Sequence, residues 1–594
     1  MKNNYPYFEI VEKRDFRDLL SSASEKFGEK LSFYEKDEND IYQGVSFKEF
    51  ENLVSYLGEG LLSLNLNQRD KIALIGKNCR KWAISYLAIT CSNFIVVPID
   101  KELKDFEIES ILRRAECKAI IFENKFYDVL KIIKDKFPDL IYLISFEKDE
   151  KTSLNIDDLI SKGKEIYEKN SIYQKINLNP EEVTSILFTS GTTGVPKGVM
   201  LSQKNILSNI RQMRSLYWID ENDLFLSVLP LHHSYECTCG FLCQIDAGSA
   251  IAYAQSLKKI ADNLYESKAT IMLGVPLLFE SFYRRIKEVG FSGVKGKIKF
   301  FIADFICKIS EILFRKNIRR KVFKKIHDKF GGKLERFISG GAALPKEVEI
   351  FFNKIGIVLV QGYGITECSP LLSVNRINKT EYIGYKLSSV GKYAKDVEIK
   401  IFDPDDRGVG EIGAKGPNVM LGYYKDPEAT KSVFCDGYFL TGDYGYVDKD
   451  GFIFISGRKK DIIITKNGKN VYPEEIEHFY TNSEIIVEIV VKESKEPNTK
   501  DPTIIAVVRP NLENISKILN ISFEEFSKPE NILKYENEIV NLVRKEIKEN
   551  NKKLPQFKMI RYFYLNYEEF EKTTTKKIKR FKVNLKGSIY NVYL

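Results

Sequence analysis

The sequence predicts an α/β protein of more than one domain, and three features of the chain support this. At 594 residues the chain exceeds the size that a single hydrophobic core normally serves. Short apolar segments alternate with longer helical ones in roughly the first 180 residues, whereas short strands and glycine-rich turns dominate after about residue 380. The composition, 43% apolar and 29% charged, is that of an ordinary globular protein.

The first part of the chain contains a clear strand–helix–strand unit. Residues 71–76 ("KIALIG") and 94–100 ("FIVVPID") are short apolar strand candidates, and residues 79–91 ("CRKWAISYLAITC") form a helix between them. Further along, Ser202 is a predicted N-cap for a helix over residues 203–217. This succession is typical of a sheet covered by helices.

After about residue 380 the predicted elements are shorter. Residues 397–416 and 444–457 are predicted hairpins, the second with an Asp-Gly turn. A smaller α+β segment begins after "GRKKD" (457–461), with strands at 484–493 and 502–510 and a helix at 537–551. Because "GRKKD" is charged and begins with a glycine, we expect an N-terminal domain over 1–457 and a C-terminal domain over 458–594.

Positive charge is concentrated in one segment. The chain carries a net charge of +9, but residues 295–336 hold fourteen Lys/Arg against four Asp/Glu, which gives +10 here and −1 elsewhere. Two amphipathic helices are predicted in this segment, with apolar stripes formed by Ile302, Ile306, Ile309 and Leu313 and by Ile318, Val322, Ile326 and Phe330.

Three interpretations of this basic segment are open: contact with anionic lipid, a solvated face of a soluble enzyme, and a nucleic-acid surface. The last is the least favoured, because Phe305, Phe323 and Phe330 lie on or near the apolar stripes instead of standing exposed for base stacking. If the segment contacts lipid, neutralising four of its cations should weaken binding to anionic vesicles. The four chosen from the sequence are Arg319, Arg320, Lys324 and Lys325.

Apolar runs and cysteines indicate the compartment. No run reaches the ~18 apolar residues of a membrane helix, and the start of the chain lacks the apolar core of a signal peptide, so we expect a cytoplasmic protein. Nine scattered cysteines favour free thiols. Cys237, Cys239 and Cys243 match no usual metal-site spacing and are interpreted as buried small hydrophobes.

A loop rich in glycine and hydroxyl groups follows the buried strand candidate 184–188. Its sequence, "LFTSGTTGVPKGVML" (187–201), resembles a Walker phosphate loop but departs from it on both sides of Lys197. Pro196 has no backbone N–H for a phosphate, and Gly198 has no hydroxyl for Mg²⁺. The loop's hydroxyls and freed N–H groups can still surround phosphates, so a different kind of phosphate loop is indicated.

Five further stretches follow in order. They are 229–236 ("LPLHHSYE"), 338–344 ("ISGGAAL"), 361–367 ("QGYGITE"), 438–477 ("YFLTGDYGYVDKDGFIFISGRKKDIIITKNGKNVYPEEIE") and 571–580 ("EKTTTKKIKR"). With the loop, they resemble the adenylate-forming superfamily of acyl-CoA synthetases, amino-acid adenylation domains and beetle luciferases, and most of all a bacterial long-chain fatty-acid–CoA ligase. Each motif alone is weak, but six in order over nearly the whole chain are specific.

The resemblance implies a fold and a nucleotide site. The fold is a large N-terminal domain of two αβ sheets plus a distorted β-barrel, with a small mobile C-terminal α+β domain. ATP phosphates are held by Thr189, Ser190, Gly191, Thr192, Thr193, Gly194 and Lys197, and adenine lies beside Gly341, Gln361, Gly362, Tyr363 and Gly364. Thr366 contacts the α-phosphate, and Glu367, with Thr189, is a ligand of Mg²⁺, as suits a hard cation.

The resemblance also assigns residues to the sugar and to the reacting groups. Asp443 can accept both ribose hydroxyls through its two oxygens, and Arg458 is the second ribose or phosphate contact. His233 borders the carboxylate site, where it shapes the pocket and orients the acid, although a purely structural histidine is the alternative. His232 is unusual at its position, and packing alone would explain it.

Three more residues belong to the two half-reactions. Lys577 is the lysine that contacts the carboxylate and the α-phosphate, where a fixed cation stabilises developing negative charge. Lys576 stands where many members have glycine, and the following "IKR" favours Lys577 of the two. Lys460 aligns with the hinge between the domains, and Gly468 with the glycine past which the pantetheine arm of CoA threads.

The implied activity is ATP-dependent conversion of a fatty acid to acyl-AMP and then to acyl-CoA, with release of pyrophosphate and AMP. The small-molecule partners are fatty acid, ATP and CoA, with Mg²⁺ as cofactor. The alternatives are an acyl–acyl-carrier-protein ligase, an aryl-acid CoA ligase and, from another class, a nucleotide-binding switch or nucleic-acid-binding ATPase that releases ADP. An amino-acid substrate is disfavoured, since Ser234 and Glu236 stand where an aspartate would bind the ammonium.

Overall fold

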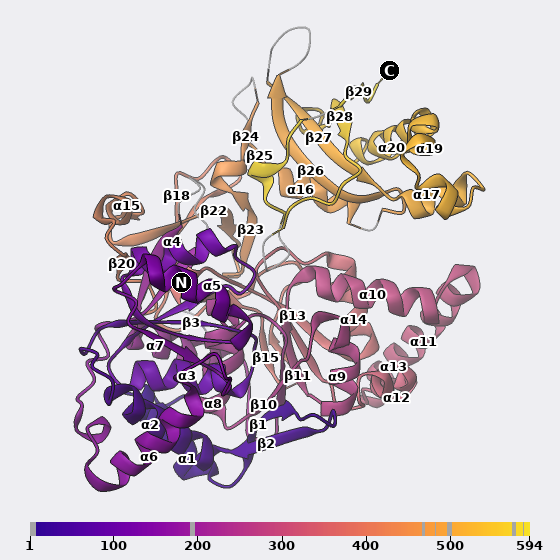
Figure 1. Ribbon diagram of the computed structural model, residues 1–594. Coiled ribbons are helices and arrows are strands. Elements are labelled where there is room, and N and C mark those ends of the chain that lie inside the picture. The colour runs from indigo at the N-terminus through magenta and orange to yellow at the C-terminus, as the bar shows by residue number, and fades with distance from the viewer. Residues whose placement is uncertain are drawn as a thin grey trace. The chain divides into compact units, whose positions relative to one another are not determined.

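The computed structural model describes residues 7–189, 196–379, 381–465, 470–481, 483–495, 502–572, 578–585 and 587–593. The chain divides into two compact units. Figure 1 shows the elements coloured by residue number from the N-terminus to the C-terminus. The first unit comprises Met1–Lys400, Ala414–Phe439 and Lys449–Ile453, and the second comprises Ile401–Gly413, Leu440–Asp448 and Phe454–Leu594. The α/β class with a large N-terminal and a smaller C-terminal part is as the sequence predicts.

A seven-stranded sheet forms one half of the first unit. Its order is β20 (Gly422–Tyr423), β8 (Lys197–Ser202), β7 (Val183–Thr189), β4 (Ile95–Ile99), β3 (Lys71–Ile75), β5 (Cys117–Phe122) and β6 (Tyr142–Ser145). Strands β7, β4, β3, β5 and β6 are parallel, and β8 runs antiparallel to β7. The apolar runs of β3 and β4 are buried, as in a sheet covered on both faces.

The second half of this unit is a nine-stranded sheet. Its order is β17 (Lys392–Tyr393), β14 (Leu371–Val374), β13 (Val358–Gly364), β12 (Arg336–Ser339), β11 (Ile271–Gly274), β9 (Leu224–Ser227), β10 (Ala250–Tyr253), β1 (Leu31–Lys36) and β2 (Tyr42–Ser46). The strands from β13 through β12, β11, β9 and β10 to β1 are parallel. Two sheets thus meet in one unit, as the family resemblance implies.

Helices connect and cover these strands. They are α1 (Phe16–Phe27), α2 (Phe47–Leu62), α3 (Arg80–Cys91), α4 (Asp105–Ala115), α5 (Tyr127–Lys136), α6 (Ile156–Asn170), α7 (Gln203–Leu216), α8 (Cys243–Ala247), α9 (Ile260–Ser267), α10 (Pro276–Gly290), α14 (Lys346–Ile355) and α15 (Pro427–Ser432). The predicted N-cap of α7 is confirmed, because the Ser202 hydroxyl accepts from the Asn205 N–H at 3.1 Å.

The basic segment forms three helices instead of the two predicted. They are α11 (Gly293–Phe314), α12 (Arg319–Val322) and α13 (Lys324–Lys329). The second predicted stripe faces inward for the most part, since Phe330 is buried and Ile318 and Ile326 pack against the core of the nine-stranded half. The first stripe, on α11, is exposed, and so is Phe305, which the sequence predicted not to stand exposed; Phe323 and Phe330 are buried as expected.

Shorter strands follow the nine-stranded sheet. They are β15 (Arg376–Asn378), β16 (Glu381–Gly384), β18 (Glu398–Phe402), β19 (Gly410–Lys415), β21 (Phe434–Cys435), β22 (Tyr438–Val447) and β23 (Ile453–Arg458). The predicted strands of 397–416 form, and β23 pairs with β22 across the predicted Asp450-Gly451 turn.

The C-terminal part of the second unit has its own α+β core. A four-stranded sheet has the order β26 (Ile486–Lys495), β27 (Pro502–Pro510), β28 (Tyr562–Leu565) and β29 (Ile589–Asn591), beside the two-stranded β24 (Ile463–Ile464) and β25 (Asn470–Val471). The helices are α16 (Pro473–Glu477), α17 (Leu512–Ile518), α18 (Phe523–Phe526), α19 (Pro529–Lys534) and α20 (Glu536–Asn551). The two strands and the long helix predicted here are confirmed.

All nine cysteines are thiols outside any disulfide, as predicted, and all but Cys435 are buried. Cys237, Cys239 and Cys243 lie on or beside the π-helical turn Tyr235–Leu242 as small buried side chains. Within the described residues, no helix has both the length and the apolarity to cross a bilayer.

Candidate active site

The flanks of the phosphate loop are held by a strand pair. Strand β7 ends at Thr189 and β8 begins at Lys197, and these two residues are register partners. The Thr189 hydroxyl donates to the Lys197 carbonyl at 3.5 Å. The other predicted phosphate-binding residues, Ser190, Gly191, Thr192, Thr193 and Gly194, lie outside the described residues.

Tyr423 connects Lys197 to Glu367. The Lys197 ammonium lies 4.9 Å from the centre of the Tyr423 ring, and the Tyr423 hydroxyl donates to Glu367 Oε1 at 3.0 Å. Burial first, and then the Glu367 carboxylate, raise the pKa of Tyr423, so the phenol stays a neutral donor. A cation, a neutral donor and a carboxylate therefore line one strip, which joins β8 and β20 to the turn after β13.

Sequence reasoning missed Tyr423. It belongs to "GYY" (422–424), two tyrosines after a glycine, and this local pattern does not reveal a partner 56 residues away. The residues present fit Mg²⁺ together with phosphates, because this ion binds one or two carboxylates and takes its other ligands from phosphate and water. Glu367 is half-buried and already positioned by one hydrogen bond.

If the strip binds nucleotide as the resemblance implies, removing the Tyr423 hydroxyl should weaken that binding. Tyr423→Phe keeps the ring over Lys197 but removes the donor to Glu367, and a hydrogen bond to a charged group is worth about 1.5–3 kcal/mol. We expect a roughly tenfold rise in the KM for ATP·Mg²⁺. Tyr424→Phe is the matched control, since that hydroxyl donates to Glu116 at the surface. Equal effects from both variants would contradict the assignment.

The motif 361–367 is joined to 338–344 by Gln361. This buried side chain accepts from the Leu344 N–H at 3.0 Å and donates to Glu349 Oε2 at 3.1 Å. Burial raises the pKa of the Glu349 carboxyl to about 7. The Gln361 amide therefore fixes β13 to α14 and to the segment 338–344, and its predicted place beside adenine stays a prediction.

Gly341 and Gly364 are glycines for different structural reasons. Gly341 has φ +84°, and the nearest atom to a Cβ built there is 3.9 Å away, so its surroundings leave room for a ligand. A Cβ on Gly364 would come within 2.2 Å of the Pro370 carbonyl, so close approach of the protein's own backbone requires this glycine. Tyr363, between Gly362 and Gly364, is largely buried.

Asn78 holds the histidine segment in place. Its amide oxygen accepts from the Leu231 N–H at 3.0 Å, and its nitrogen donates to the Leu229 carbonyl at 2.7 Å. The segment is linked to the nucleotide motif through Ser234, whose hydroxyl donates to Thr366 Oγ1 at 3.4 Å. Thr366 and the histidine segment are therefore brought together.

His232 has an acidic partner that the sequence did not reveal. Its Nε2 lies 3.5 Å from Asp100 Oδ2, and its ring centre is 4.2 Å from that of the half-buried His233. Burial by itself would raise the pKa of Asp100, but the hydrogen bond and charge of His232 lower it to about 2. One group of three among the described residues has the geometry to hold a metal ion, and it is Asp100, His232 and His233.

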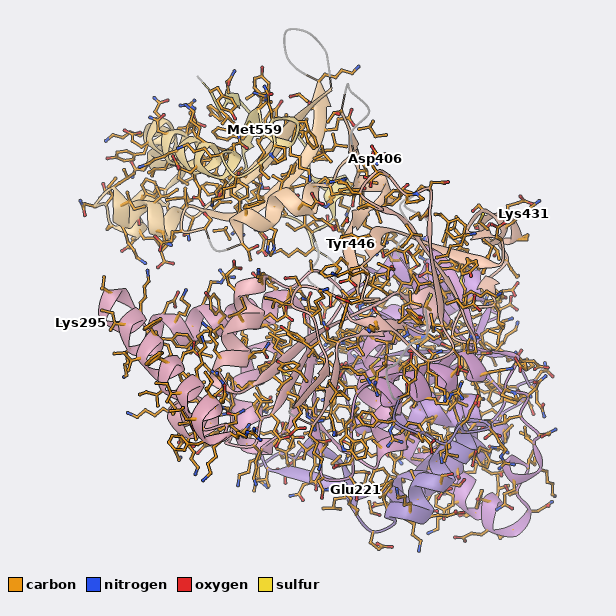
Figure 2. All side chains as sticks on the ribbon, turned by 180° about the vertical axis from the view of Figure 1, so that it is seen from behind. Glu221, Lys295, Asp406, Lys431, Tyr446 and Met559 are labelled. Atoms are coloured by element: carbon orange, nitrogen blue, oxygen red, sulfur yellow. The ribbon has the colours of Figure 1, made fainter. Side chains whose placement is uncertain are left out.

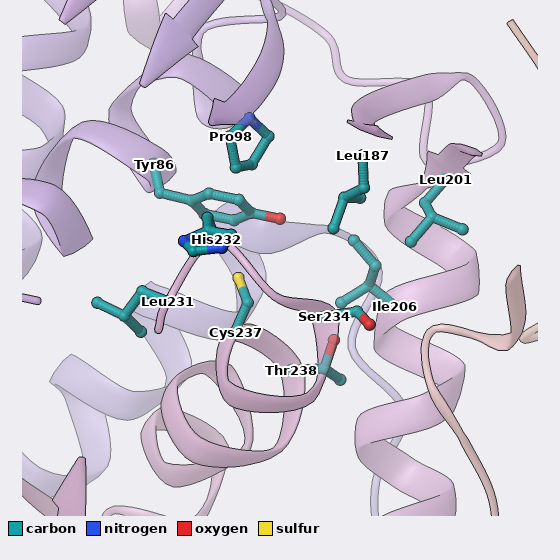
Figure 3. A pocket seen from close by; sticks show the side chains of 10 residues that line it. All are labelled: Tyr86, Pro98, Leu187, Leu201, Ile206, Leu231, His232, Ser234, Cys237 and Thr238. Carbon is teal, nitrogen blue, oxygen red and sulfur yellow. The ribbon is translucent and has the colours of Figure 1, made fainter. Parts of the chain in front are cut away.

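A small apolar cavity borders His232 and Ser234 (Figure 3). The space in which the centre of a water molecule can lie is about 10 Å³, which is enough for one water molecule. The lining residues are Tyr86, Pro98, Leu187, Leu201, Ile206, Leu231, His232, Ser234, Cys237 and Thr238. Because Leu187 and Leu201 come from β7 and β8, the cavity lies near the strands that flank the phosphate loop.

Glu236, at the start of the π-helical turn, is a fully buried carboxyl. Ser227 Oγ donates to it at 2.5 Å. Burial raises its pKa from 4.5 to about 8, against the smaller opposing effect of hydrogen bonds from Ser227 and the Val228 N–H. The carboxyl is therefore protonated in the folded protein at neutral pH.

Glu236 should make stability fall as pH rises. Between its ordinary pKa of 4.5 and about 8, the folded chain keeps a proton that the unfolded chain loses, so the free energy of unfolding decreases with pH across this window. Glu236→Gln stays neutral in both states and should flatten that slope. Urea unfolding midpoints measured across this pH window test the effect, and parallel slopes for the two proteins would contradict it.

In the second unit the predicted ribose residues pair with each other. Arg458 Nε lies 2.8 Å from Asp443 Oδ1, and the Asp443 N–H donates to the Thr441 hydroxyl at 3.1 Å. Lys460 is the exposed central residue of a 3₁₀ turn, Lys459–Asp461, anchored by Lys459 Nζ to Glu411 Oε2 at 2.6 Å. Gly468 and Lys577 lie outside the described residues.

Comparisons with known proteins show the family of the chain. The model of the AMP-binding enzyme family matches residues 20–424. A chloroplastic long-chain-fatty-acid–[acyl-carrier-protein] ligase of Arabidopsis thaliana is 29% identical over 80% of this chain and 74% of its own length. A long-chain-fatty-acid–CoA ligase of Escherichia coli is 27% identical over 77% of this chain and 81% of its own length.

A solved structure shares the fold. The crystal structure of an anthranilate CoA ligase with anthranoyl-AMP matches with a TM-score of 0.73 and 19% identity, over 96% of this chain and 97% of that chain.

Proposed function

The chain belongs to the AMP-binding enzyme family, and from this premise we propose that it activates a long-chain fatty acid with ATP and transfers the acyl group to CoA. The observation that carries the proposal is the continuous strip Lys197–Tyr423–Glu367, which Thr366 and Ser234 extend to the histidine segment. In this proposal the phosphates, the divalent cation and the substrate carboxylate meet along this strip. Both relatives named above act on long-chain fatty acids.

In the first half-reaction, a carboxylate oxygen forms a bond to the α-phosphorus of ATP. The bond from that phosphorus to the bridging oxygen of pyrophosphate breaks, and pyrophosphate takes the electron pair. Lys197 and the loop beginning at Thr189 attract the leaving phosphates, and Thr366 contacts the α-phosphate. Mg²⁺, held by Glu367 with Thr189, would neutralise phosphate charge when bound. Fixed positive charge lets two anions approach each other.

The acyl chain enters beside the histidine segment in this proposal. His233 orients the carboxylate, and Asp100 fixes the neighbouring His232 by their close contact. The apolar side chains around the small cavity, among them Leu187, Leu201 and Ile206, support an aliphatic substrate, because they offer the alkyl chain apolar contacts. The cavity must widen for a long chain, since it holds one water molecule here.

In the second half-reaction, the CoA sulfur attacks the acyl carbon, the bond from that carbon to AMP breaks, and the thiol proton leaves. We propose that a C-terminal domain beginning near residue 458 rotates about Lys460 between the half-reactions, which exposes the acyl-AMP to the thiol. Asp443 and Arg458 hold the ribose, and Gly468 leaves the passage for the pantetheine arm. A cytoplasmic location with peripheral contact of 295–336 to an anionic membrane completes this proposal.

An acyl carrier protein is the second candidate acceptor, because the Arabidopsis relative is a ligase of that kind. An aryl acid is a further alternative to a fatty acid. ATP-dependent AMP release, measured across a panel of fatty and aryl acids with CoA or carrier protein supplied, tests all of these. We expect AMP and pyrophosphate with long-chain acids and CoA. ADP as the product would reject the proposed reaction in favour of an ATPase or switch.

A further inference from the structure

Helix α11 presents an apolar face to the outside of the first unit. Its outward large apolar residues are Val294, Ile298, Phe301, Ile302, Phe305, Ile306, Ile309, Ile312, Leu313 and Phe314, with exposed fractions from 36% (Ile309) to 77% (Ile312). Figure 1 shows α11 at the outer edge of the unit, and Figure 2 places Lys295 at the outer end of this helix. Scattered exposed apolar residues are ordinary, but ten along one helix mark an interaction surface.

The apolar residues form one stripe bordered by cations. At 3.6 residues per turn, those from Val294 to Leu313 fall within an arc of roughly 140°. Lys297 and Lys308 lie along one edge of the stripe, Lys299 lies along the other edge, and Lys295 lies just inside that edge, all of them exposed. An apolar stripe with lysine edges is typical of helices that lie in a membrane interface.

The polar side of α11 anchors the helix to the protein. Asp304 is buried and accepts from Arg319 Nη1 at 2.9 Å, with Lys354 Nζ 3.3 Å away. Cys307 joins the core, and the Phe300 ring stacks on Phe351 with centres 5.3 Å apart. The outward direction of the stripe is therefore fixed by a buried ion pair and by core contacts on the opposite side.

This anchoring changes which cations can meet a lipid headgroup. Arg319 is buried in its pairs with Asp304 and Glu311, Arg320 donates to the carbonyls of Leu334 and Gly332, and Lys324 pairs with Asp328. Three of the four cations selected from the sequence are thus engaged within the protein. Lys308 likewise pairs with Asp304 at 3.2 Å, so Lys295, Lys297 and Lys299 are the better candidates.

Charge decides which partner fits the stripe. A second copy of the chain would bring the same cations against these, and like charges oppose that contact. Anionic headgroups attract them, at about 1 kcal/mol for each basic residue near the surface. Helix α11 is not long and apolar enough to cross a bilayer, so a helix that binds lipid here would lie in the membrane interface.

We propose that α11 docks the protein on an anionic bilayer, with its apolar stripe in the interface and Lys295, Lys297 and Lys299 among the headgroups. The inference deepens the proposed function and rests on it for its purpose, because long-chain fatty acids concentrate in membranes. The docking itself depends only on the apolar stripe and its cations.

Sedimentation with vesicles tests the docking independently of catalysis. The unmodified protein should sediment with vesicles of phosphatidylcholine and phosphatidylglycerol and not with phosphatidylcholine alone. A triple variant, Phe301→Ser, Phe305→Ser and Ile312→Ser, should lose at least about 100-fold in partitioning, because three apolar side chains no longer enter the interface. Changing Lys295, Lys297 and Lys299 to Gln should cost roughly fivefold per lysine at low salt.

The matched control replaces exposed apolar residues elsewhere in the first unit: Phe106→Ser, Ile132→Ser and Leu257→Ser, which are 53–67% exposed. It should bind vesicles like the unmodified protein. AMP release from octanoate in solution should be equal in all these proteins, and if that activity is absent altogether, the vesicle result still stands. Failure of the unmodified protein to bind, or equal binding by the α11 triple variant, overturns the docking. So does a dimer of the unmodified protein that the α11 changes dissociate, since the stripe then binds a second copy.

Discussion

Lys577→Ala is expected to reduce fatty-acid-dependent exchange of labelled pyrophosphate into ATP by about 10²–10³-fold, the usual cost of removing one preorganised electrostatic donor. Negative charge accumulates where the carboxylate meets the α-phosphate only during adenylation. Once acyl-AMP exists, the proposed rotation carries this lysine away. Supplied with preformed acyl-AMP and CoA, the variant should therefore form thioester at close to the unmodified rate.

The lysines on either side of Lys577 in the sequence support this assignment. Lys572 Nζ lies 2.6 Å from Glu488 Oε1, and Lys579 Nζ lies 2.7 Å from Glu571 Oε1. Hydrogen bonds from Lys579 and Lys582, opposed weakly by burial, lower the pKa of Glu571 to about 2. These lysines already form ion pairs with carboxylates of the second unit, so they are poor candidates for the lysine that contacts the α-phosphate.

Lys576→Ala is the internal control for this experiment. Lys572 and Ile578 form an antiparallel bridge on either side of residues 573–577, which lie outside the described residues. The choice between the two lysines therefore rests on the motif and not on the structure. If Lys576→Ala loses pyrophosphate exchange while Lys577→Ala keeps it, Lys576 is the residue that serves adenylation.

Lys460→Pro should separate the half-reactions in the opposite direction. Lys460 is the centre of the 3₁₀ turn Lys459–Asp461, in which the Ile462 N–H bonds to the Lys459 carbonyl at 3.4 Å. Proline fixes φ near −65° and also restricts the residue before it, so a turn that must change its backbone angles becomes locked. Acyl-AMP should form at the normal rate, and thioester formation should fall by more than about tenfold.

Lys460→Ala is the matched variant, because it removes the side chain and leaves the backbone free. Single-turnover measurements of acyl-AMP and of thioester, made on both variants, check the hinge. Loss of both half-reactions in Lys460→Pro would show that the turn supports the catalytic site directly. A thioester defect of equal size in Lys460→Ala would assign the effect to the ammonium group.

Local signals account for the elements that the sequence predicted correctly. The apolar run 71–76 became β3, the Ser202 cap began α7, and the paired runs 484–493 and 502–510 became neighbouring strands. Each of these elements depends on residues within one strand or one turn of helix, so the local sequence is sufficient to predict it. The order of the motifs likewise predicted the family without any knowledge of distances.

Contacts between distant residues decided what the sequence left open. Tyr423 reaches Glu367 across 56 positions, and Asp100 reaches His232 from the end of β4, so neither partner can be found from local spacing. The spacing of apolar residues in the sequence predicted the stripe on α11. Periodicity shows which residues share a helix face, but it does not show whether that face points to the core or to solvent. Its outward direction follows from Asp304, which is buried against Arg319 and Lys354, because an ionised group removed from water must face its partners.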